Sequence, residues 1–394
     1  MEKQKCPEVR FKEFTGEWQE NTLGNTTEIY DNLRKPITAS QRVLGNTPYY
    51  GANGIQGYIK GFTHDGEFAL IAEDGANDLI EYPVQHVTGK IWVNNHAHVL
   101  HGVESVLKTL FLVYRIKSLD IVKYLVGGGR SKLNASVMKG INFFLPCVIE
   151  QTQIGNFFQN LDQSIALQEK KLTQTQNLKK AMLEKMFPKA GGKQPEIRLK
   201  WFSGDWTISK IGDIFDVTSG ATPLRSNPRF FENAIIDWVK TTDLNNGIIH
   251  RTEEKVSAVA LAETSIKILP KGTVFVAMYG GFNQIGRTGL LSSDATCNQA
   301  LSAIYPNDKV EPYYLLTYLN FKVDSWKDLA ASSRKDPNIT KSDVLSFPLL
   351  YPSVKEQNEI SQFFKQLDET LVLQQQQLQS LKNLKQAFLE KMFV

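Results

Sequence analysis

The sequence predicts an α+β protein in which two mixed α/β domains are joined by a long two-helix coiled coil, with an internal repeat relating the two halves. Three observations predict this fold class. Two segments recur along the chain, the longer of them has the apolar spacing of a coiled coil, and the stretches between the repeats contain short β-branched and aromatic runs bounded by turn residues.

The repeat organises the whole chain. The segment PEVRFKEFTGEW at residues 7–18 returns as PEIRLKWFSGDW at 195–206, a shift of 188 positions. Residues 150–187 return as 356–393, a shift of 206 positions, with 19 of 38 positions identical. The stretch between the repeated segments is therefore 18 residues longer in the second half, and the two stretches share little sequence.

Each copy of the longer repeat is predicted to be one helix. Apolar residues recur at alternating steps of four and three, which is the 3.5-residue seam of a coiled coil. Pro146 and Pro352 precede the two segments, and each helix is expected to be roughly 55 Å long. The two stripes would most simply bury each other, although each could instead pack on its own domain as an ordinary amphipathic helix. The seam residues are Ile154, Phe158, Leu161, Ile165 and Leu172 in the first copy and Ile360, Phe364, Leu367, Leu371 and Leu378 in the second.

This pattern divides the chain into four parts: a first domain at 1–146, a central helix and linker at 147–192, a second domain at 193–352 and a C-terminal helix at 353–394. Short apolar runs between Gly, Asn and Asp predict strands, and longer apolar segments predict helices. We expect strands within 49–58, 67–72, 89–93, 272–279 and 301–305, and helices at 102–116 and 312–319.

Composition narrows the function classes. The 394 residues are 42% hydrophobic, and no apolar run approaches the ~20 residues of a membrane helix, so we expect a cytoplasmic protein that does not contact a membrane. The net charge is +4; residues 7–146 carry 14 basic and 14 acidic side chains, and residues 195–352 carry 17 of each. Neither domain has the basic excess that is typical of a strong phosphate-binding surface.

No active site is predicted. The phosphate-binding pattern GxxxxGK[ST] and the nucleophile motif GxSxG are missing, and the three cysteines form no CxxC pair. His96 and His98 could offer two imidazoles to a metal, but no carboxylate or cysteine at ligand spacing completes such a site. We interpret these histidines as polar partners near a strand, and we predict neither a metal nor a cofactor.

The loops of both domains hold side chains that can read base edges. Asn and Gln can pair with adenine, Arg and Lys with guanine, and Thr methyl groups can contact thymine. For any one of these residues, the alternative is that a polar loop side chain only forms a turn. The candidates are Tyr49, Tyr50, Asn53, Asn95, His96, Arg130, Lys132 and Asn134 in the first domain, and Thr222, Arg225, Lys240, Thr241, Tyr279, Asn283, Gln284, Arg287, Asn298 and Gln299 in the second.

The chain resembles the specificity subunit of type I restriction-modification systems over essentially its whole length. The resemblance rests on the paired Phe-x-Gly-x-Trp segments at 14–18 and 202–206, the two Pro-x-x-x-Glu-Gln segments, and the twice-used helix that ends in Leu-Glu-Lys-Met-Phe. Thr222-Pro, WVKTTDL at 238–244 and Asn298-Gln in the second half also resemble the family. Residues 49–58 and 92–99 of the first half are similar to a different type of recognition domain.

The resemblance implies two target recognition domains, separated and oriented by two helices that pair antiparallel, and it implies no catalytic residue. It also implies the partners: double-stranded DNA, two methyltransferase (modification) subunits and a restriction (motor-nuclease) subunit. Methyltransferases that close around the duplex could supply much of the phosphate contact, which would account for two neutral domains. The expected function is the reading of a bipartite, asymmetric DNA target; the alternative is a non-catalytic protein-interaction scaffold with two binding domains on a helical spacer.

Overall fold

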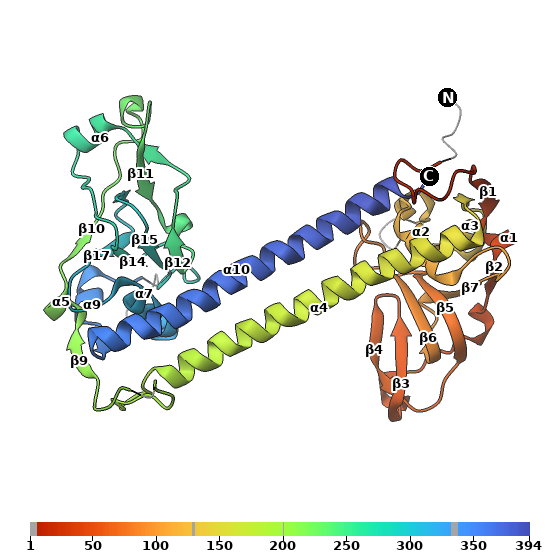
Figure 1. Ribbon diagram of the computed structural model, residues 1–394, viewed down its shortest axis with the longest axis horizontal. Helices are drawn as coiled ribbons and strands as arrows, with labels where there is room; N and C mark the ends of the chain where they lie inside the picture. The colour runs from red at the N-terminus through yellow and green to blue at the C-terminus, as the bar shows by residue number, and fades with distance from the viewer. Residues whose placement is uncertain (1–5, 128–130, 200, 332–337) are drawn as a thin grey trace. The chain divides into compact units, whose positions relative to one another are not determined.

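The computed structural model describes residues 6–127, 131–199, 201–331 and 338–394, and the chain forms two compact units. Unit 1 comprises residues 1–170 and 375–394, and unit 2 comprises residues 171–374. Each unit therefore combines one body with a part of both long helices (Figure 1). The boundaries expected from sequence instead assign bodies and helices to separate segments.

The two long helices are α4 (Val148–Met186) and α10 (Val354–Lys391), of 39 and 38 residues. All ten predicted seam residues are buried or half-buried, whereas most residues between them are exposed. In unit 1 the beginning of α4 packs on the end of α10, where the ring centroids of Phe157 and Phe388 lie 5.0 Å apart. In unit 2 the opposite ends meet, and Phe187 lies 6.0 Å from Phe364. The helices therefore pack together antiparallel (Figure 1).

Unit 1 is built on a six-stranded sheet in the order β2-β7-β5-β6-β3-β4. Its strands and helices are β1 (Gln19–Thr22), α1 (Leu23–Thr26), β2 (Thr27–Ile29), η1 (Asp31–Leu33), η2 (Ala39–Gln41), β3 (Leu44–Gly51), β4 (Gly54–Ile59), β5 (His64–Ala72), β6 (Val84–Val93), β7 (Ala97–Gly102), α2 (Thr109–Lys117), η3 (Ile121–Tyr124), α3 (Ala135–Lys139) and β8 (Asn142–Leu145). Strands β3 and β6 run parallel and the other paired strands antiparallel, while β1 and β8 form a separate two-stranded sheet. Helix α2 and the beginning of α4 close the main core on one side of the sheet.

The helix that we expected at residues 102–116 begins later, at Thr109. Gly102 is still a strand residue, because it pairs with Thr27 at the end of β7. It also lies so close to the carbonyl oxygen of Leu107 that an added Cβ would be 2.2 Å from that atom. The chain therefore has to turn back on itself between residues 103 and 108 before the helix can form.

Unit 2 contains a five-stranded sheet in the order β10-β17-β14-β15-β12, a three-stranded sheet in the order β13-β11-β16 and the pair β18-β9. Its elements are β9 (Thr207–Lys210), α5 (Ile211–Ile214), β10 (Val217–Ser219), η4 (Pro228–Phe230), β11 (Ile236–Val239), η5 (Thr241–Asp243), β12 (Gly247–Ile249), β13 (Lys255–Val256), α6 (Ala258–Glu263), β14 (Val274–Ala277), β15 (Thr288–Leu291), β16 (Thr296–Cys297), β17 (Leu301–Ile304), α7 (Pro312–Phe321), α8 (Val323–Ala331), α9 (Lys341–Ser346) and β18 (Pro348–Tyr351). The strands predicted within 272–279 and 301–305 and the helix predicted at 312–319 are confirmed.

The same contacts fasten each body to its long helix. Arg10 donates two hydrogen bonds of 2.7 Å to the carboxylate of Glu150, and Arg198 donates two of 2.8 Å to Glu356. The glutamine that follows each glutamate bonds backbone groups that precede the helix, since Gln151 and Gln357 each donate to two carbonyls and accept from one amide. The sequence repeat is therefore a repeat of three-dimensional contacts.

The residues at the ends of the long helices complete the two cores. Phe187 is fully buried in unit 2 and Phe393 is 7% exposed in unit 1. The first helix thus ends in the core of the second body, and the second helix ends in the core of the first. The rings around Phe393 include Trp18, Phe111 and Phe158, and those around Phe187 include Trp206, Tyr314 and Phe364.

Candidate nucleic-acid interface

In unit 1, four loops meet at one end of the large sheet. They are the β3–β4 turn, residues 73–82, residues 94–96 and the described part of 126–134. Glu73 links two of them, because its amide donates to the His96 carbonyl at 2.8 Å and its carbonyl accepts from Leu133 at 2.7 Å. Asn53 links a third, since its amide nitrogen donates to Gly75 and its side-chain oxygen accepts from Asn77, both at 2.9 Å.

This convergence brings Asn53, His96 and Lys132 into one cluster of loops. Asn53, Asn95 and His96 are exposed, and Tyr50, Lys132 and Asn134 are half-buried. Arg130 lies outside the described residues. The predicted residues at the surface of the cluster are therefore polar, whereas Leu79, Ile80 and Val126 of the same loops are apolar and exposed.

Tyr49 has a different surrounding. It is 1% exposed, its ring lies 4.1 Å below the Arg42 guanidinium, and its hydroxyl is next to the backbone of Ile37. A ring with so little exposure offers no face on which a base could stack. We therefore do not propose Tyr49 as a base-reading residue.

Several of the clustered side chains already have partners. Both polar groups of Asn53 are used on the neighbouring loop, His96 Nδ1 lies 2.5 Å from Asp74, and the Lys132 ammonium lies 2.7 Å from Glu73. Asn53 thus acts as a turn former in this structure. His96 and Lys132 would have to exchange a carboxylate for a nucleic-acid group in order to bind one.

A buried ionic network beneath these loops was not predicted. His98 is 1% exposed, and its two ring nitrogens face acceptors: Nδ1 lies 2.6 Å from Asp31, and Nε2 lies 2.8 Å from the Leu133 carbonyl. Arg34 lies 2.6 Å from Glu73, so the network joins η1, β5, β7 and the loop that follows residue 126.

Asp31, Glu73 and His98 offer ligand atoms within 4.8 Å of one another, a spacing that could hold a metal ion. The carboxylates come from positions far from His98 in the sequence, so no spacing rule would have found them. Arg34 and Lys132 already bind Glu73, and both nitrogens of His98 are engaged. The donor set therefore fits an ionic network that fixes the loops better than it fits a metal centre.

The charges of the network shift the acidities of its carboxylates. Burial raises the pKa of Glu73, but Lys132, Arg34 and His98 lower it more, so its pKa lies below the usual value. The same holds for Asp31, where burial raises the pKa while His98, the Val99 amide and Arg34 lower it further.

A carboxylate with a lowered pKa stabilises the fold above the pKa of the unfolded chain, and this stabilisation is lost as the pH falls through the folded-state pKa. We expect Glu73→Gln to destabilise unit 1 by about 1.5–3 kcal/mol at pH 7, because two cations lose a charged partner. The difference from wild type should shrink below about pH 4. Hydrogen exchange of the β5 amides at pH 7 and pH 3 measures it, and a difference that does not change with pH would contradict the network.

In unit 2, backbone hydrogen bonds bring together residues 219–225, 238–241, 278–287 and 298–300. Ala221 donates to Cys297 at 3.1 Å, Asn298 to Val239 at 2.9 Å, and Met278 to Ala300 at 2.8 Å. A close approach at Gly220 makes this possible, since an added Cβ there would lie 1.9 Å from the Cys297 carbonyl oxygen. Among the predicted residues, Thr222, Arg225, Tyr279, Asn283 and Gln299 are exposed, Lys240, Gln284, Arg287 and Asn298 are half-buried, and Thr241 is buried.

Glu254 holds two of the cationic candidates of this cluster. Its carboxylate lies 2.5 Å from the Arg225 guanidinium and 2.7 Å from the Lys240 ammonium. The bonds from Arg225 and Lys240 lower the pKa of Glu254, and the bond to Glu254 raises the pKa of Lys240. Arg225 also lies over the rings of Phe231 and Trp238. Both cations are therefore engaged within the protein.

The glycine-rich loop at 278–287 presents a different group of side chains. Tyr279 and Phe282 are 40% and 46% exposed, although Ile285 behind them is fully buried. Phe282 was not predicted; an aromatic residue between Gly281 and Asn283 is the signal that could have found it. Within the described residues, the Arg287 guanidinium has no side-chain partner, which separates it from Arg225 and Lys240.

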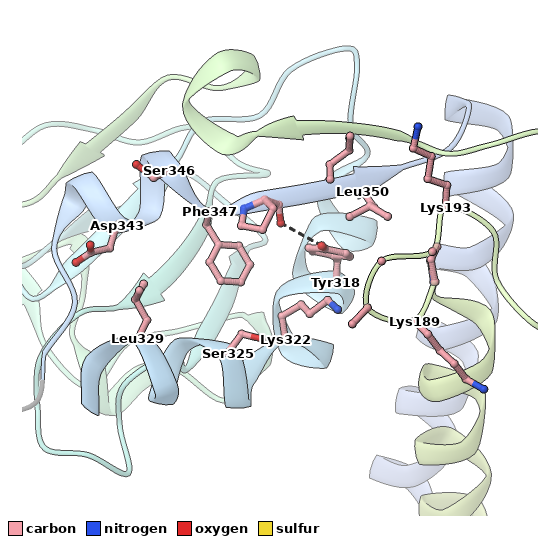
Figure 2. A pocket seen from close by; sticks show the side chains of 16 residues that line it. Lys189, Lys193, Tyr318, Lys322, Ser325, Leu329, Asp343, Ser346, Phe347 and Leu350 are labelled. Atoms are coloured by element: carbon pink, nitrogen blue, oxygen red, sulfur yellow. Dashed lines mark hydrogen bonds between the residues drawn. The ribbon is translucent and has the colours of Figure 1, made fainter. Parts of the chain in front are cut away.

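Unit 2 also has a cavity of about 490 Å³ that none of the predicted base-reading residues lines. Figure 2 shows its wall: the linker that carries Lys189 and Lys193, the helical residues Tyr318 and Lys322, and strand β18. The Tyr318 hydroxyl donates to the Pro348 carbonyl at 3.0 Å and so ties the helix to the strand. This cavity marks where the chain leaves α4, away from the candidate reading residues.

Among the described residues, no helix combines the length and the apolar character that crossing a membrane would require.

Comparisons with known proteins place this geometry in a family. A Haemophilus influenzae protein named as a type I restriction enzyme specificity subunit is 44% identical over 138 residues, which are 35% of each chain. The specificity subunit of EcoR124I/EcoR124II from Escherichia coli is 22% identical over 43% of each chain. The chain thus spans about a third to two-fifths of the length of these two relatives. The MjaIX specificity subunit of Methanocaldococcus jannaschii is 23% identical over 72% of this chain and 67% of its own.

Solved structures share the fold across the whole chain. The crystal structure of a type I restriction-modification S subunit from M. genitalium matches 99% of both chains with a TM-score of 0.69 and 14% identity. A structure from a study of complex assembly in the type I R-M system matches 95% of this chain, with a TM-score of 0.53 and 17% identity. The family described as "Type I restriction modification DNA specificity domain" matches residues 15–177 and 203–383. Because these two stretches make up most of the sequence, the chain belongs to the family of type I restriction-modification DNA specificity domains.

Proposed function

We propose that this chain is the sequence-specificity subunit of a type I restriction-modification complex. It reads a bipartite, asymmetric target in double-stranded DNA, with unit 1 reading one part and unit 2 the other. It carries out no chemistry itself and positions two methyltransferase subunits and one restriction (motor-nuclease) subunit on that target.

The observation that carries this proposal is the combination of one repeated frame with two unlike bodies. The contacts of Arg10 and Arg198 with the long helices are the same in both units, whereas the sheets above them differ in strand number and order. A repeated frame with different loops is what a reader of two different half-sites needs. If both bodies face one side of the duplex, the half-site centres lie about one helical turn, ~10 bp, apart.

The weak positive charge of the loops supports a model in which this chain contacts bases and its partner subunits contact most of the phosphates. Lys132, Arg225 and Lys240 are all paired with carboxylates of the same unit. Phosphate contacts fix position and supply much of the affinity, whereas base contacts carry the sequence information. The chain on its own should therefore bind DNA weakly, and the methyltransferase subunits should supply most of the phosphate contacts.

Two measurements test the proposal together. A gel shift with and without the co-expressed methyltransferase should give tight, sequence-specific binding only for the complex. Mapping of methylated adenines should then give one motif made of two different parts separated by an unread gap. A continuous motif would contradict the bipartite reading, and tight binding of many unrelated proteins without DNA would favour the scaffold.

We expect Arg287→Ala to relax the half-site that is read by unit 2 and to leave the other unchanged. An arginine that forms two hydrogen bonds with guanine contributes ~1–3 kcal/mol of discrimination, and Arg287 is the candidate cation of its cluster whose guanidinium no carboxylate of the described residues holds. Methylation of target libraries with each position randomised measures the effect. Arg287→Lys should restore affinity only in part, because lysine cannot form the bidentate contact.

Arg225→Ala is the matched control, since Arg225 is held by Glu254 in the same loop cluster. Uniform loss of affinity for all sequences in Arg287→Ala would identify a phosphate contact. No loss would identify a turn residue.

The paired helices are expected to act as a ruler. Insertion of one heptad into both helices, after Gln168 and after Gln374, should lengthen each by ~10 Å and lengthen the unread gap by about 3 bp. Insertion into one helix only should strain the pair and reduce activity. Retained activity with an unchanged gap would mean that the helices do not set the spacing.

A further inference from the structure

Each unit has a pocket at the place where its body meets a long helix. The pocket of unit 1 has a volume of about 490 Å³ and that of unit 2 about 600 Å³. The two pockets are lined at equivalent positions of the repeat. Phe14, Glu17 and Val148 line the first, and Phe202, Asp205 and Val354 line the second.

The floor of each pocket is formed by the ion pair that joins the body to its long helix. Arg10 and Arg198 give their charge to Glu150 and Glu356, and their remaining nitrogens donate to the carbonyls of Gly16 and Gly204. These ion pairs explain why the floor has to be the same in both units. They leave the two arginines no free charge to offer to a ligand.

The rim is also alike. Glu17 and Asp205 are exposed, and both place a carboxylate on the rim, where Asp205 Oδ1 accepts a 2.9 Å hydrogen bond from the Gln194 side chain. Phe14 and Phe202 are half-buried beside them and leave part of each ring accessible. An exposed position that only closes a turn tolerates many residue types, yet the acidic and aromatic character occurs in both copies.

The bodies above the pockets differ in sequence and in sheet topology, so their ligands differ. A site that keeps the same chemistry in both units is instead suited to one ligand bound twice. We propose that each pocket binds the same segment of a protein partner that is present in two copies. The segment places an apolar side chain against the aromatic ring and the valine, and a lysine or arginine against the carboxylate of the rim.

This inference rests on the proposed function, because the binding partner used in the experiment is the methyltransferase subunit of the same complex. Native mass spectrometry of the full chain with this probe should give two copies per chain. Glu17→Lys should weaken binding at unit 1 about tenfold or more and leave one copy under limiting conditions, and Asp205→Lys should do the same at unit 2. The double variant should retain none.

Matched controls are Asp65→Lys and Glu232→Lys, which reverse exposed charges of the same two units outside the pockets. They should retain two copies, and melting curves of the four charge variants should coincide because each altered side chain is exposed. Val148→Trp and Val354→Trp fill the pockets without changing charge and should give the same loss of copies.

The two levels of the proposal fail in different ways. Two copies bound by the Glu17→Lys/Asp205→Lys double variant, and by the chain that carries both Val148→Trp and Val354→Trp, would overturn the pocket inference and leave the proposed function intact. A wild-type chain that binds no methyltransferase would overturn the proposed function and the inference with it. Equal losses in the control variants would show that net charge decides binding, which also overturns the pocket inference.

Discussion

Replacement of Phe393 by alanine is expected to destabilise unit 1 by about 3–5 kcal/mol and to leave unit 2 unchanged. The ring packs among Trp18, Phe111 and Phe158, so truncation leaves a cavity in the middle of the core. Phe187→Ala should have the converse effect, because that ring lies in the core of unit 2. Each substitution therefore acts on the body that lies in the other half of the sequence.

Hydrogen exchange resolved by segment is the appropriate measurement, since two units need not unfold as one. Protection should fall in β5 for Phe393→Ala and in β14 for Phe187→Ala. Leucine at either position fills part of the cavity and should cost less than alanine. Loss of protection in unit 2 for Phe393→Ala, or in unit 1 for Phe187→Ala, would contradict the finding that each long helix ends in the core of the other body.

A fragment that ends at Gly192 is expected to form a symmetric dimer. It keeps the first body and α4 but lacks residues 375–394, which complete unit 1. A second copy can supply the missing part, because residues 150–187 match 356–393 at 19 of 38 positions and end in the same Leu-Glu-Lys-Met-Phe. Phe187 of one copy would then take the place of Phe393 in the other.

Such a dimer presents two copies of the first body in inverted orientation. With the methyltransferase added, it should modify a palindrome built from the half-site of unit 1. Light scattering at micromolar concentration and methylation mapping are the two measurements. A monomeric fragment would exclude the helix pairing, modification of a direct repeat would exclude its antiparallel sense, and Phe187→Ala in the fragment should weaken the dimer.

The frame of this fold could be predicted because its signals are periodic or repeated. The spacing of Ile154, Phe158 and Leu161 defines a buried stripe whatever surrounds it, and every predicted seam residue is buried or half-buried. The division into units could not be predicted in the same way. Whether Phe187 packs in the body before it or the body after it depends on which ends of the helices meet.

Fewer of the contacts in the candidate site could be predicted from the sequence. His98 joins Asp31 and Glu73 only because η1 lies beside β7 and the end of β5 in the folded unit, and no local spacing encodes that. Tyr49 and Tyr50 looked equivalent in sequence. Successive strand residues point to opposite faces, so one of two adjacent tyrosines had to turn inward, and the buried one is Tyr49.

The division of the chain into units has a consequence for its biosynthesis. A ribosome releases the first body early, but the residues that finish its core, 375–394, emerge after all of unit 2. At about 5–20 residues per second, the stretch between Lys170 and Gln375 takes roughly 10 to 40 s to make. Until residues 375–394 emerge, the part of the α4 stripe that lies in unit 1 lacks the stretch of α10 on which it packs. On a crowded polysome the nearest matching stripe belongs to a neighbouring nascent chain, so the order of translation itself sets a competition between correct closure and pairing of two unfinished molecules.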